Sequence, residues 1–277
     1  MVIRPRLALL LLLLVAAVRL AANEPGPVLV LGALEVEVRP VVAALADPEP
    51  VDVLGLRCVG GRLAGRRAVA AVTGVGKVNA AMTTALLVER FSPAAVIFTG
   101  IAGALDSGLQ PGDVVVGETL VQHDLVRHTE QGVVLREVRN PRDGTDNPIA
   151  LEPSPPLLAL ARQAAGGPGL ALVEAAGQPR PPRLAFGTIA TGDSFVGSRA
   201  KKEELRERTG AFAVEMEGAA VAQVCYQHGV PFLVVRGLSD RAAGDARGEA
   251  RRNMETAAGN AAAVALAVVR SLGPGPP

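Results

Sequence analysis

Three carboxylates, Glu37, Glu217 and Asp240, fall where a buried apolar run gives way to a polar or helical segment. Two carboxylic acids in one pocket can supply both an acid and a base, because their surroundings can ionise one and keep the other protonated. Each acid also has a structural interpretation: Glu37 and Glu217 fit the first turn of a helix, and Asp240 fits the cap of a turn. Their occurrence at the ends of three separate strands favours a catalytic pocket.

Small residues next to polar groups mark six strand ends along the chain. In open α/β sheets, ligands bind outside the carboxyl ends of strands, where small residues let the backbone approach the ligand. The sequence therefore predicts one pocket shared by these ends. Besides the three acids, the candidate pocket residues from this pattern are Val75, Ile101, Gly103, Phe195, Met216 and Ser239.

The elements that must position these residues alternate between strands and helices. Continuous Val, Ile and Leu runs bounded by glycine are typical of strands buried on both faces. The runs and the helical patterns that follow them are 28–34 with 35–46, 67–76 with 77–91, and 94–105 with 112–121. This alternation predicts an α/β fold.

The second half of the chain continues the alternation up to a closing Ala-rich helix. The expected elements are strand 184–195, exposed helix 198–209, strand 211–217, helix 218–228, strand 231–240 and a helix near 249–272. Between residues 127 and 183 the pattern weakens, and Pro- and Gly-rich turns surround one helix, 157–165. We interpret this segment as a variable excursion within one domain spanning 27–272, followed by a disordered tail at 273–277.

Composition and motifs exclude several classes of partner and cofactor. The 277 residues carry a net charge of +1 without a run of like charge, so no nucleic-acid partner is expected and a small molecule is the default ligand. The two cysteines, Cys58 and Cys225, lack neighbours at metal-ligand spacing and are expected as separate buried thiols. The loop TGVGKVN has Val78 where a phosphate-binding P-loop needs Ser or Thr. We expect neither a metal nor a nucleotide cofactor.

The N-terminus has the pattern of a secretory signal at residues 1–22. Arg4 and Arg6 precede an apolar run at 7–18, and small residues follow it. A membrane-spanning helix needs about 20 apolar residues, and Arg19 ends the run too early for that. We expect an exported, periplasmic or extracellular protein without stable membrane association once the signal is cleaved. Retention of the segment as an anchor remains the alternative.

The segment VEMEGAAVAQVCYQHGVPFLVVRGLSD resembles the signature of 5'-methylthioadenosine/S-adenosylhomocysteine nucleosidases, within the purine nucleoside phosphorylase superfamily. The resemblance extends through LGALEVEVRPV, TGVGKVNAAMTTALLVERF, PGDVVVGETLVQHD and TGDSFVGS, and so covers nearly all of 28–272 outside 127–183. It implies a three-layer α/β/α sandwich with a central mixed sheet, usually a homodimer. The implied activity is hydrolysis of the N-glycosidic bond of a purine nucleoside, without a cofactor.

The resemblance also implies roles for individual residues. Glu37 takes the position of the acid that activates water, and Asp240 that of the acid that protonates or hydrogen-bonds purine N7. Glu217 takes the position that grips the ribose hydroxyls, where its helix N-terminus is expected to keep it ionised. The supporting residues are Met216 against the sugar, Phe195 and Val196 at the purine, Arg236 beside the water and Ser239 beside Asp240.

Two departures from the family pattern leave the substrate open. The family usually has a serine where Ile101 stands, and an aromatic residue in the flap after the Ser-Asp motif, where this chain reads RAAGDARGEARRNMETAA. The group at the nucleoside 5' position is therefore open, as are adenosine, inosine and deoxyadenosine as substrates.

Two alternative functions are weighed against hydrolysis. A phosphorylase needs cations for its phosphate, and such relatives carry an Arg in the loop that reads FTGIAG here, where Thr99 and Ile101 supply none. Holding phosphate about 4 Å from the Glu37 carboxylate would cost roughly 4 kcal/mol at an effective dielectric near 20. Water is therefore the expected nucleophile. The other alternative is a nucleoside-binding protein without catalysis, against which the presence of Glu37 and Asp240 argues.

Overall fold

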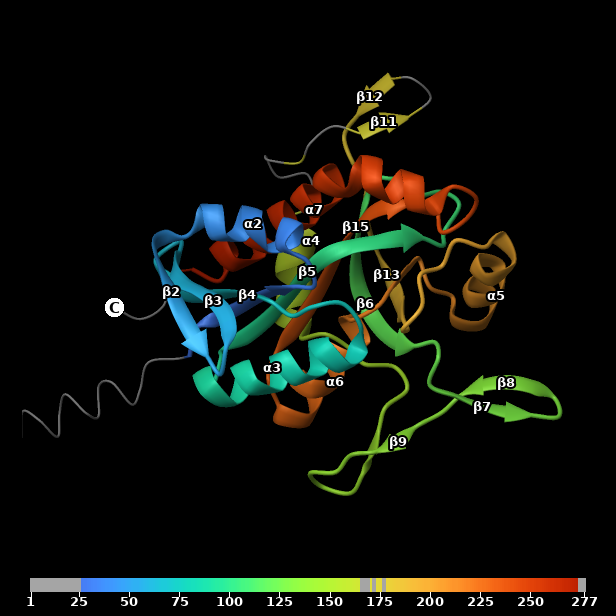
Figure 1. Cartoon of the computed structure of the whole chain (residues 1–277), viewed down its shortest axis with the longest axis horizontal. Coiled ribbons are helices and arrows are strands. Elements are labelled where there is room, and N and C mark those ends of the chain that lie inside the picture. Colours follow the sequence, from blue (N-terminus) through green and yellow to red (C-terminus); the bar gives the residue numbers. More distant parts are fainter. Residues whose placement is uncertain (1–25, 165–169, 171–172, 176–177, 274–277) are drawn as a thin grey trace, which may run out of the picture.

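The computed structural model describes residues 26–164, 170, 173–175 and 178–273 (Figure 1). The expected signal peptide at 1–22 and residues 274–277 of the expected tail lie outside these ranges. Among the described residues, no helix combines the length and the apolar character needed to cross a membrane.

A nine-stranded mixed sheet forms the centre of the molecule, in the order β14-β13-β6-β15-β5-β1-β4-β3-β2. Its strands are β1 (Val28–Gly32), β2 (Ala46–Val53), β3 (Leu56–Leu63), β4 (Arg66–Val72), β5 (Ala95–Ala104), β6 (Val114–Gln122), β13 (Leu184–Thr191), β14 (Ala213–Glu215) and β15 (Phe232–Asp240). Strands β4, β1, β5 and β15 run parallel, whereas β6 pairs antiparallel with β15. The short β14 pairs with both β13 and β5, so the sheet curls back on itself.

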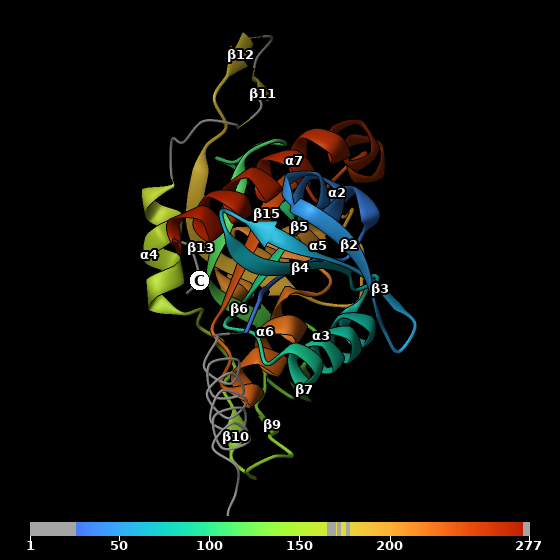
Figure 2. The same cartoon turned by 90° about the vertical axis from the view of Figure 1, so that its left-hand side faces the viewer.

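Helices cover both faces of this sheet, which confirms the predicted three-layer sandwich (Figures 1 and 2). The helices are α2 (Glu35–Ala44), α3 (Lys77–Phe91), α4 (Pro155–Gln163), α5 (Arg199–Thr209), α6 (Gly218–His228) and α7 (Ala246–Ser271). Helices α2 and α4 pack beside α7 on one face, and α3 packs beside α6 on the other. Helix α5 lies at the end of the sheet near β13.

The core has two apolar layers, one on each side of the sheet. Val28 and Val30 of β1 belong to the layer under α2 and α7, and Leu29 and Leu31 belong to the layer over α3 and α6. Side chains alternate between the faces of a strand, so a strand covered on both sides must be apolar throughout. The prediction of strands buried on both faces is therefore confirmed.

Two elements differ from the sequence-based expectation. Residues 112–121, expected to follow their strand as a helix, instead supply β6, whose Val114, Val115 and Val116 are buried in the middle of the sheet. Three consecutive β-branched residues favour a strand. The unpredicted hairpin β2–β3 turns at Leu54 and Gly55, both with positive φ, which suits a tight hairpin turn.

The excursion between β6 and β13 contains more structure than one helix. Helix α4 occurs close to where it was expected, and three two-stranded sheets accompany it. Their strands are β7 (Val126–Thr129) with β8 (Gly132–Leu135), β9 (Val138–Arg139) with β10 (Asp146–Asn147), and β11 (Val173–Ala175) with β12 (Gln178–Arg180). The two cysteines are buried and unpaired, as expected.

Candidate active site

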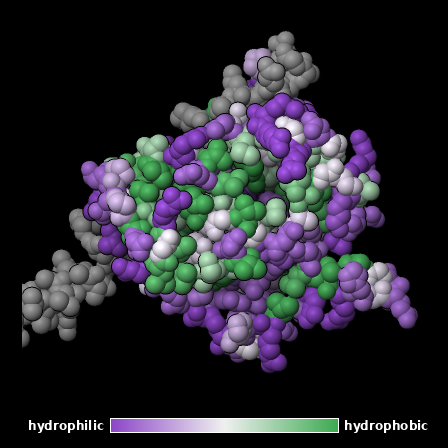
Figure 3. All heavy atoms as spheres, in the orientation of Figure 1, coloured by the Kyte–Doolittle hydropathy of each residue, from purple (hydrophilic) through white to green (hydrophobic). Residues whose placement is uncertain are grey.

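A cavity of about 340 Å³ opens at the ends of six strands of the main sheet. This volume lies in the range of pockets that enclose a small ligand. The lining comes from the carboxyl ends of β5, β14 and β15, from the loops just beyond β1, β4 and β13, and from α2 and α7. Figure 3 shows the mouth as a hollow bordered by hydrophobic surface.

The structure brings nearly all the predicted site residues to this one cavity. The predicted residues that line it are Glu37, Val75, Ile101, Gly103, Phe195, Val196, Met216, Glu217, Ser239 and Asp240. Arg236 lies behind the wall, fully buried. Further lining residues, which the sequence analysis did not single out as ligand contacts, are Ala33, Leu34, Ala102, Ser194, Val214, Glu215, Arg247, Ala250, Arg251 and Met254.

The Glu37 carboxylate is fixed by three backbone N–H groups. Its Oε2 accepts hydrogen bonds from Ala33 at 2.6 Å and Leu34 at 2.8 Å, and its Oε1 accepts one from Ile101 at 2.8 Å. Burial raises the pKa of Glu37, while Arg236 and these hydrogen bonds act in the opposite direction. The result is a rigid, buried carboxylate whose proton affinity exceeds that of an ordinary glutamate, which suits a general base.

Asp240 is a second buried carboxylate, at the end of β15. Its Oδ1 accepts a hydrogen bond from the Ala242 N–H at 2.8 Å, and its Oδ2 accepts one from the Ser239 hydroxyl at 2.8 Å. Burial raises the pKa of Asp240 despite these two bonds. A protonated Asp240 can therefore persist at a higher pH than a solvent-exposed aspartate, as a general acid requires.

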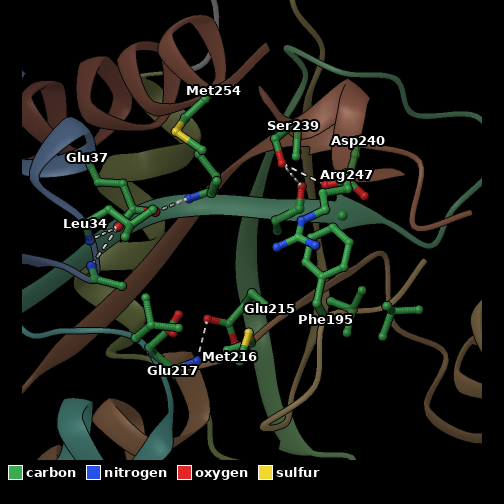
Figure 4. A pocket seen from close by; sticks show the side chains of 18 of the residues that line it. Leu34, Glu37, Phe195, Glu215, Met216, Glu217, Ser239, Asp240, Arg247 and Met254 are labelled. Atoms are coloured by element: carbon green, nitrogen blue, oxygen red, sulfur yellow. Dashed lines mark hydrogen bonds between the residues drawn. The ribbon is translucent and has the colours of Figure 1, made fainter. Parts of the chain in front are cut away.

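The two acids of the Glu-Met-Glu segment lie on the same side of the pocket (Figure 4) but have different partners. Glu215 Oε2 accepts hydrogen bonds from the backbone N–H groups of Glu217 and Gly218 and pairs with the Arg236 guanidinium. Glu217 instead accepts a hydrogen bond from the Gly76 N–H at 2.8 Å, at the start of α3, and its carboxylate lies 3.6 Å from Arg236. Glu215 is thus a structural carboxylate, and Glu217 faces the cavity.

The expectation that the N-terminus of α6 keeps Glu217 ionised is wrong. Glu217 is the N-cap residue of α6, yet its side chain makes no capping bond there, because Glu215 occupies that helix end. Burial and the neighbouring Glu215 raise the pKa of Glu217 to about 7. The charge of Glu217 therefore changes near neutral pH.

Gly100 allows the close approach of Arg236 and Glu37. A Cβ at position 100 would lie 1.9 Å from Arg236 Nη1 and 2.7 Å from Glu37 Oε1. Arg236 Nη1 has no hydrogen-bond partner among the described residues, although Nη2 is paired. The unpaired Arg236 Nη1 and the Glu37 Oε1 atom therefore both lie beside the Gly100 backbone.

The walls between these polar groups are mostly apolar. Phe195 is 56% exposed, and Val196 is buried. Met216 and Met254 line opposite parts of the cavity in Figure 4. An exposed aromatic ring beside buried acids provides a surface on which a planar base can stack.

Helix α7 supplies the part of the site that sequence reasoning missed. Its lining residues are Arg247, Ala250, Arg251 and Met254. Their spacing of i, i+3, i+4 and i+7 places them on one helix face. The family resemblance placed residues 241–258 as a flap near the nucleoside 5' position, but it did not single out these four residues, and nothing in the sequence showed that this face turns toward Asp240.

The chain is similar to known proteins over most of its length. A family model described as Phosphorylase superfamily matches residues 27–271. A 5'-methylthioadenosine/S-adenosylhomocysteine nucleosidase of Shewanella halifaxensis (strain HAW-EB4) is 33% identical over 244 residues, which are 88% of this chain and 98% of that protein.

Two solved structures show the same fold. One is a 5'-methylthioadenosine/S-adenosylhomocysteine nucleosidase from Neisseria meningitidis in complex with methylthio-immucillin-A, with a TM-score of 0.77, 34% identity and coverage of 89% of this chain and 99% of the other. The second is futalosine hydrolase of Helicobacter pylori strain 26695, with a TM-score of 0.76, 32% identity and coverage of 89% and 98%.

Proposed function

Because this chain belongs to the phosphorylase superfamily and is a hydrolase of the N-glycosidic bond, we propose that it cleaves purine nucleosides of the 5'-methylthioadenosine/S-adenosylhomocysteine type. The observation that carries the proposal is the convergence of Glu37, Glu217 and Asp240 on one cavity. The products are the free purine and the ribosyl sugar.

In this proposal Glu37 activates a water molecule. The water oxygen forms a bond to C1' of the ribose, and its proton passes to the Glu37 carboxylate. Arg236 Nη1, which lies beside Glu37 and lacks a partner among the described residues, donates a hydrogen bond to the same water. Three backbone N–H groups already orient the carboxylate, so little reorganisation is needed when the proton arrives.

Asp240 acts on the leaving base. As the bond between C1' and N9 breaks, its electron pair moves into the purine, and Asp240 gives a proton to N7. The Ser239 hydroxyl donates to Asp240 Oδ2 and stabilises the carboxylate that remains. Phe195 stacks on the purine, and the Val196 backbone binds its edge.

Glu217 binds the sugar. An ionised carboxylate accepts hydrogen bonds from both ribose hydroxyls, and its negative charge stabilises the positive charge that develops on the ribose. Met216 packs against the ring from the neighbouring position in the cavity wall.

The proposal extends to a homodimer. Val75, just before α3, and Val78 and Met82, in its first two turns, are 44%, 77% and 52% exposed. Val75 also lines the cavity, so this apolar surface continues from the site to the outside of the molecule. A second copy that covers it would remove apolar side chains from water. Light scattering of the purified protein tests this: a monomer at micromolar concentration would contradict it.

The proposal also includes export to the periplasm or the outside of the cell. It rests on Arg4 and Arg6 ahead of the apolar run at 7–18. N-terminal sequencing of the protein recovered from fractionated cells tests this, with a first residue near 23 expected. A full-length chain in the cytoplasmic fraction would contradict export.

A substrate panel tests the activity itself. The mature protein is incubated with methylthioadenosine, adenosylhomocysteine, adenosine and inosine, each with and without phosphate, and the free base is measured. Release that does not depend on phosphate is expected. No release from any of the four contradicts the proposal, and a ribose 1-phosphate product would indicate a phosphorylase.

A further inference from the structure

Two cationic side chains at the cavity are not used by the chemistry proposed above. Arg247 and Arg251, the mouth arginines, line the cavity from α7, and both are exposed to solvent. They are one helical turn apart and therefore lie on one face of α7. Figure 4 shows the Arg247 side chain reaching into the pocket region that contains Phe195 and Asp240.

The acids of the same segment are already engaged by other arginines. Each carboxylate between residues 245 and 255 has an ion-pair partner that is not a mouth arginine. The pairs are Arg241 with Glu249, Arg252 with Asp245, and Arg39 with Glu255. Within the described part of the chain, neither mouth arginine has an ion pair, so both guanidinium groups are available to a ligand.

Helix stability does not explain these positions. Arg247 is the second residue of α7, where the helix dipole disfavours a cation. Two like charges at i and i+4 also repel each other. Each effect is small at the surface, but both have the same sign. The arrangement therefore favours a role outside the fold, namely the neutralisation of a negative charge that is bound next to both arginines.

The chemistry of a bound nucleoside indicates where that charge lies. In a ribonucleoside the 5' carbon lies on the face of the ribose opposite the 2' and 3' hydroxyls. A ribose that gives its hydroxyls to Glu217 therefore directs its 5' carbon away from Glu217. Met216 and Glu217 form one side of the pocket, and the side chains from α7 form the other (Figure 4). A group at the 5' position thus extends toward α7.

We propose that the mouth arginines bind an anionic group, a phosphate or a carboxylate, attached at the 5' position of the purine nucleoside. This inference rests on the proposed function and names the class of its substrate. The cavity interior is lined by the carboxyl groups of Glu37, Glu215, Glu217 and Asp240, and those that are ionised repel an anion. The anionic group therefore stays at the mouth, where its charge meets the two guanidinium groups.

Matched substrates test the inference. The first pair is 5'-ethylthioadenosine and 5'-(carboxymethyl)thioadenosine, which differ by a methyl group and a carboxylate. The second pair is adenosine and adenosine 5'-monophosphate. For each pair, kcat/KM is measured by release of adenine, and Kd is measured by calorimetry, so that binding is known even without turnover.

The variants are R247M/R251M and the control R252M. Arg252 is adjacent in sequence and exposed, but it does not line the cavity and instead pairs with Asp245. We expect the wild-type protein to prefer the anionic member of at least one pair by about tenfold, as two charge-assisted contacts would give. R247M/R251M should abolish that preference, and R252M should keep it. A preference within the first pair indicates that the arginines bind a carboxylate, and a preference within the second pair indicates a phosphate.

Several outcomes overturn the inference. One is equal kcat/KM and equal Kd for the members of both pairs, with adenine released from all, which leaves the proposed function standing. Another is a preference that survives in R247M/R251M or disappears equally in R252M. A third is formation of ribose 1-phosphate from inorganic phosphate that R247M/R251M removes, because the arginines would then bind a co-substrate. Arginine-dependent binding of the anions without release of adenine would support the inference while refuting the proposed function.

Discussion

Glu215 pairs with the guanidinium of Arg236, and both side chains are almost completely buried. The same carboxylate accepts two backbone N–H groups at the start of α6, so one acid neutralises a buried cation and closes a helix end. Glu217, two residues later, lies farther from the same guanidinium, at 3.6 Å, and makes no capping bond, so its carboxylate can face the ligand. Removal of one member of a buried ion pair leaves an uncompensated charge. We therefore interpret the Glu215–Arg236 pair as a structural contact that holds the sugar-binding side of the site in place.

Asp240→Asn tests the general acid. Asparagine retains an oxygen for the Ala242 N–H, so the fold should persist, but it cannot donate the proton that N7 requires. We expect kcat to fall by about 10²- to 10⁴-fold, measured by adenine release, with an unchanged circular dichroism spectrum. Ser239→Ala should show a smaller loss. Normal turnover by the Asn variant would remove the assigned role.

Glu37→Gln tests the general base. The glutamine amide must turn its NH₂ group toward at least one of the backbone N–H groups that the carboxylate accepts now. We expect a loss of activity similar to that of Asp240→Asn and a decrease of about 1–3 kcal/mol in the free energy of unfolding. Urea denaturation measures the second effect. Retention of full activity in a destabilised variant would show that Glu37 is only structural.

Gly100→Ala tests the contact between Arg236 and Glu37. The added methyl group would lie 1.9 Å from Arg236 Nη1, so the guanidinium, the carboxylate or the strand must move. We expect a large loss of kcat/KM and a lower melting temperature. Gly259→Ala is the matched control, because nothing lies within 4 Å of its added Cβ in α7. That control should raise stability by about 0.5–1 kcal/mol. Equal behaviour of the two variants would contradict the crowding at Gly100.

The ionisation of Glu217 should appear in the pH dependence of substrate binding. Only the ionised carboxylate accepts hydrogen bonds from both ribose hydroxyls, and its pKa is raised to about 7. KM should therefore fall as pH rises through about 7 for nucleosides that carry both hydroxyls. The corresponding 2',3'-dideoxynucleoside and the variant Glu217→Gln should lack this dependence. A KM for the wild-type protein that is constant from pH 5.5 to 8.5 would refute the role of Glu217.

The same pKa shift has a consequence for stability. A glutamate with a pKa near 4.5 in the unfolded chain and about 7 in the folded one binds more protons when folded between these values. The free energy of unfolding of the wild-type protein should therefore decrease as pH rises from 4.5 to 7, by up to about 3 kcal/mol from this group. Glu217→Gln should be more stable than the wild type at pH 8, by urea denaturation, and similar to it near pH 4.5.

The local parts of the fold could be predicted from the sequence. The run 28–34 is apolar at every position, and 231–240 is apolar apart from Arg236 and the closing Ser239 and Asp240, as expected of strands covered on both faces. The helix at 218–228 follows from its apolar spacing and from Gly229, which has a positive φ at the helix end. The expectation of a helix at 112–121 was wrong. Helices follow the other strands in this part of the chain, but here the β-branched residues Val114, Val115 and Val116 favour a strand.

The candidate cavity residues were also visible in the sequence, because small and polar residues at strand ends are a local pattern. The sequence did not determine how those ends meet. Strand β13 runs parallel to β6, and β6 runs antiparallel to β15, so a flat sheet would place the ends of β13 and β15 at opposite edges. The pairing of β14 with both β13 and β5 curls the sheet and brings these ends to one cavity.

The sequence by itself determined most of the strands and helices and the candidate acids Glu37, Glu217 and Asp240, because each depends on residues within one or two turns of the chain. The family resemblance already implied that Glu217 binds the sugar and Glu215 is structural, but only the tertiary structure shows why. Glu215 and Glu217 are chemically identical, and their roles differ because their neighbours differ. Arg236 of β15 lies beside Glu215, whereas Gly76, just before α3, donates its N–H to Glu217. The tertiary structure also decided that one face of α7 lines the cavity, because that contact depends on how α7 packs against the end of β15. Such long-range contacts are set by packing, which local patterns do not specify.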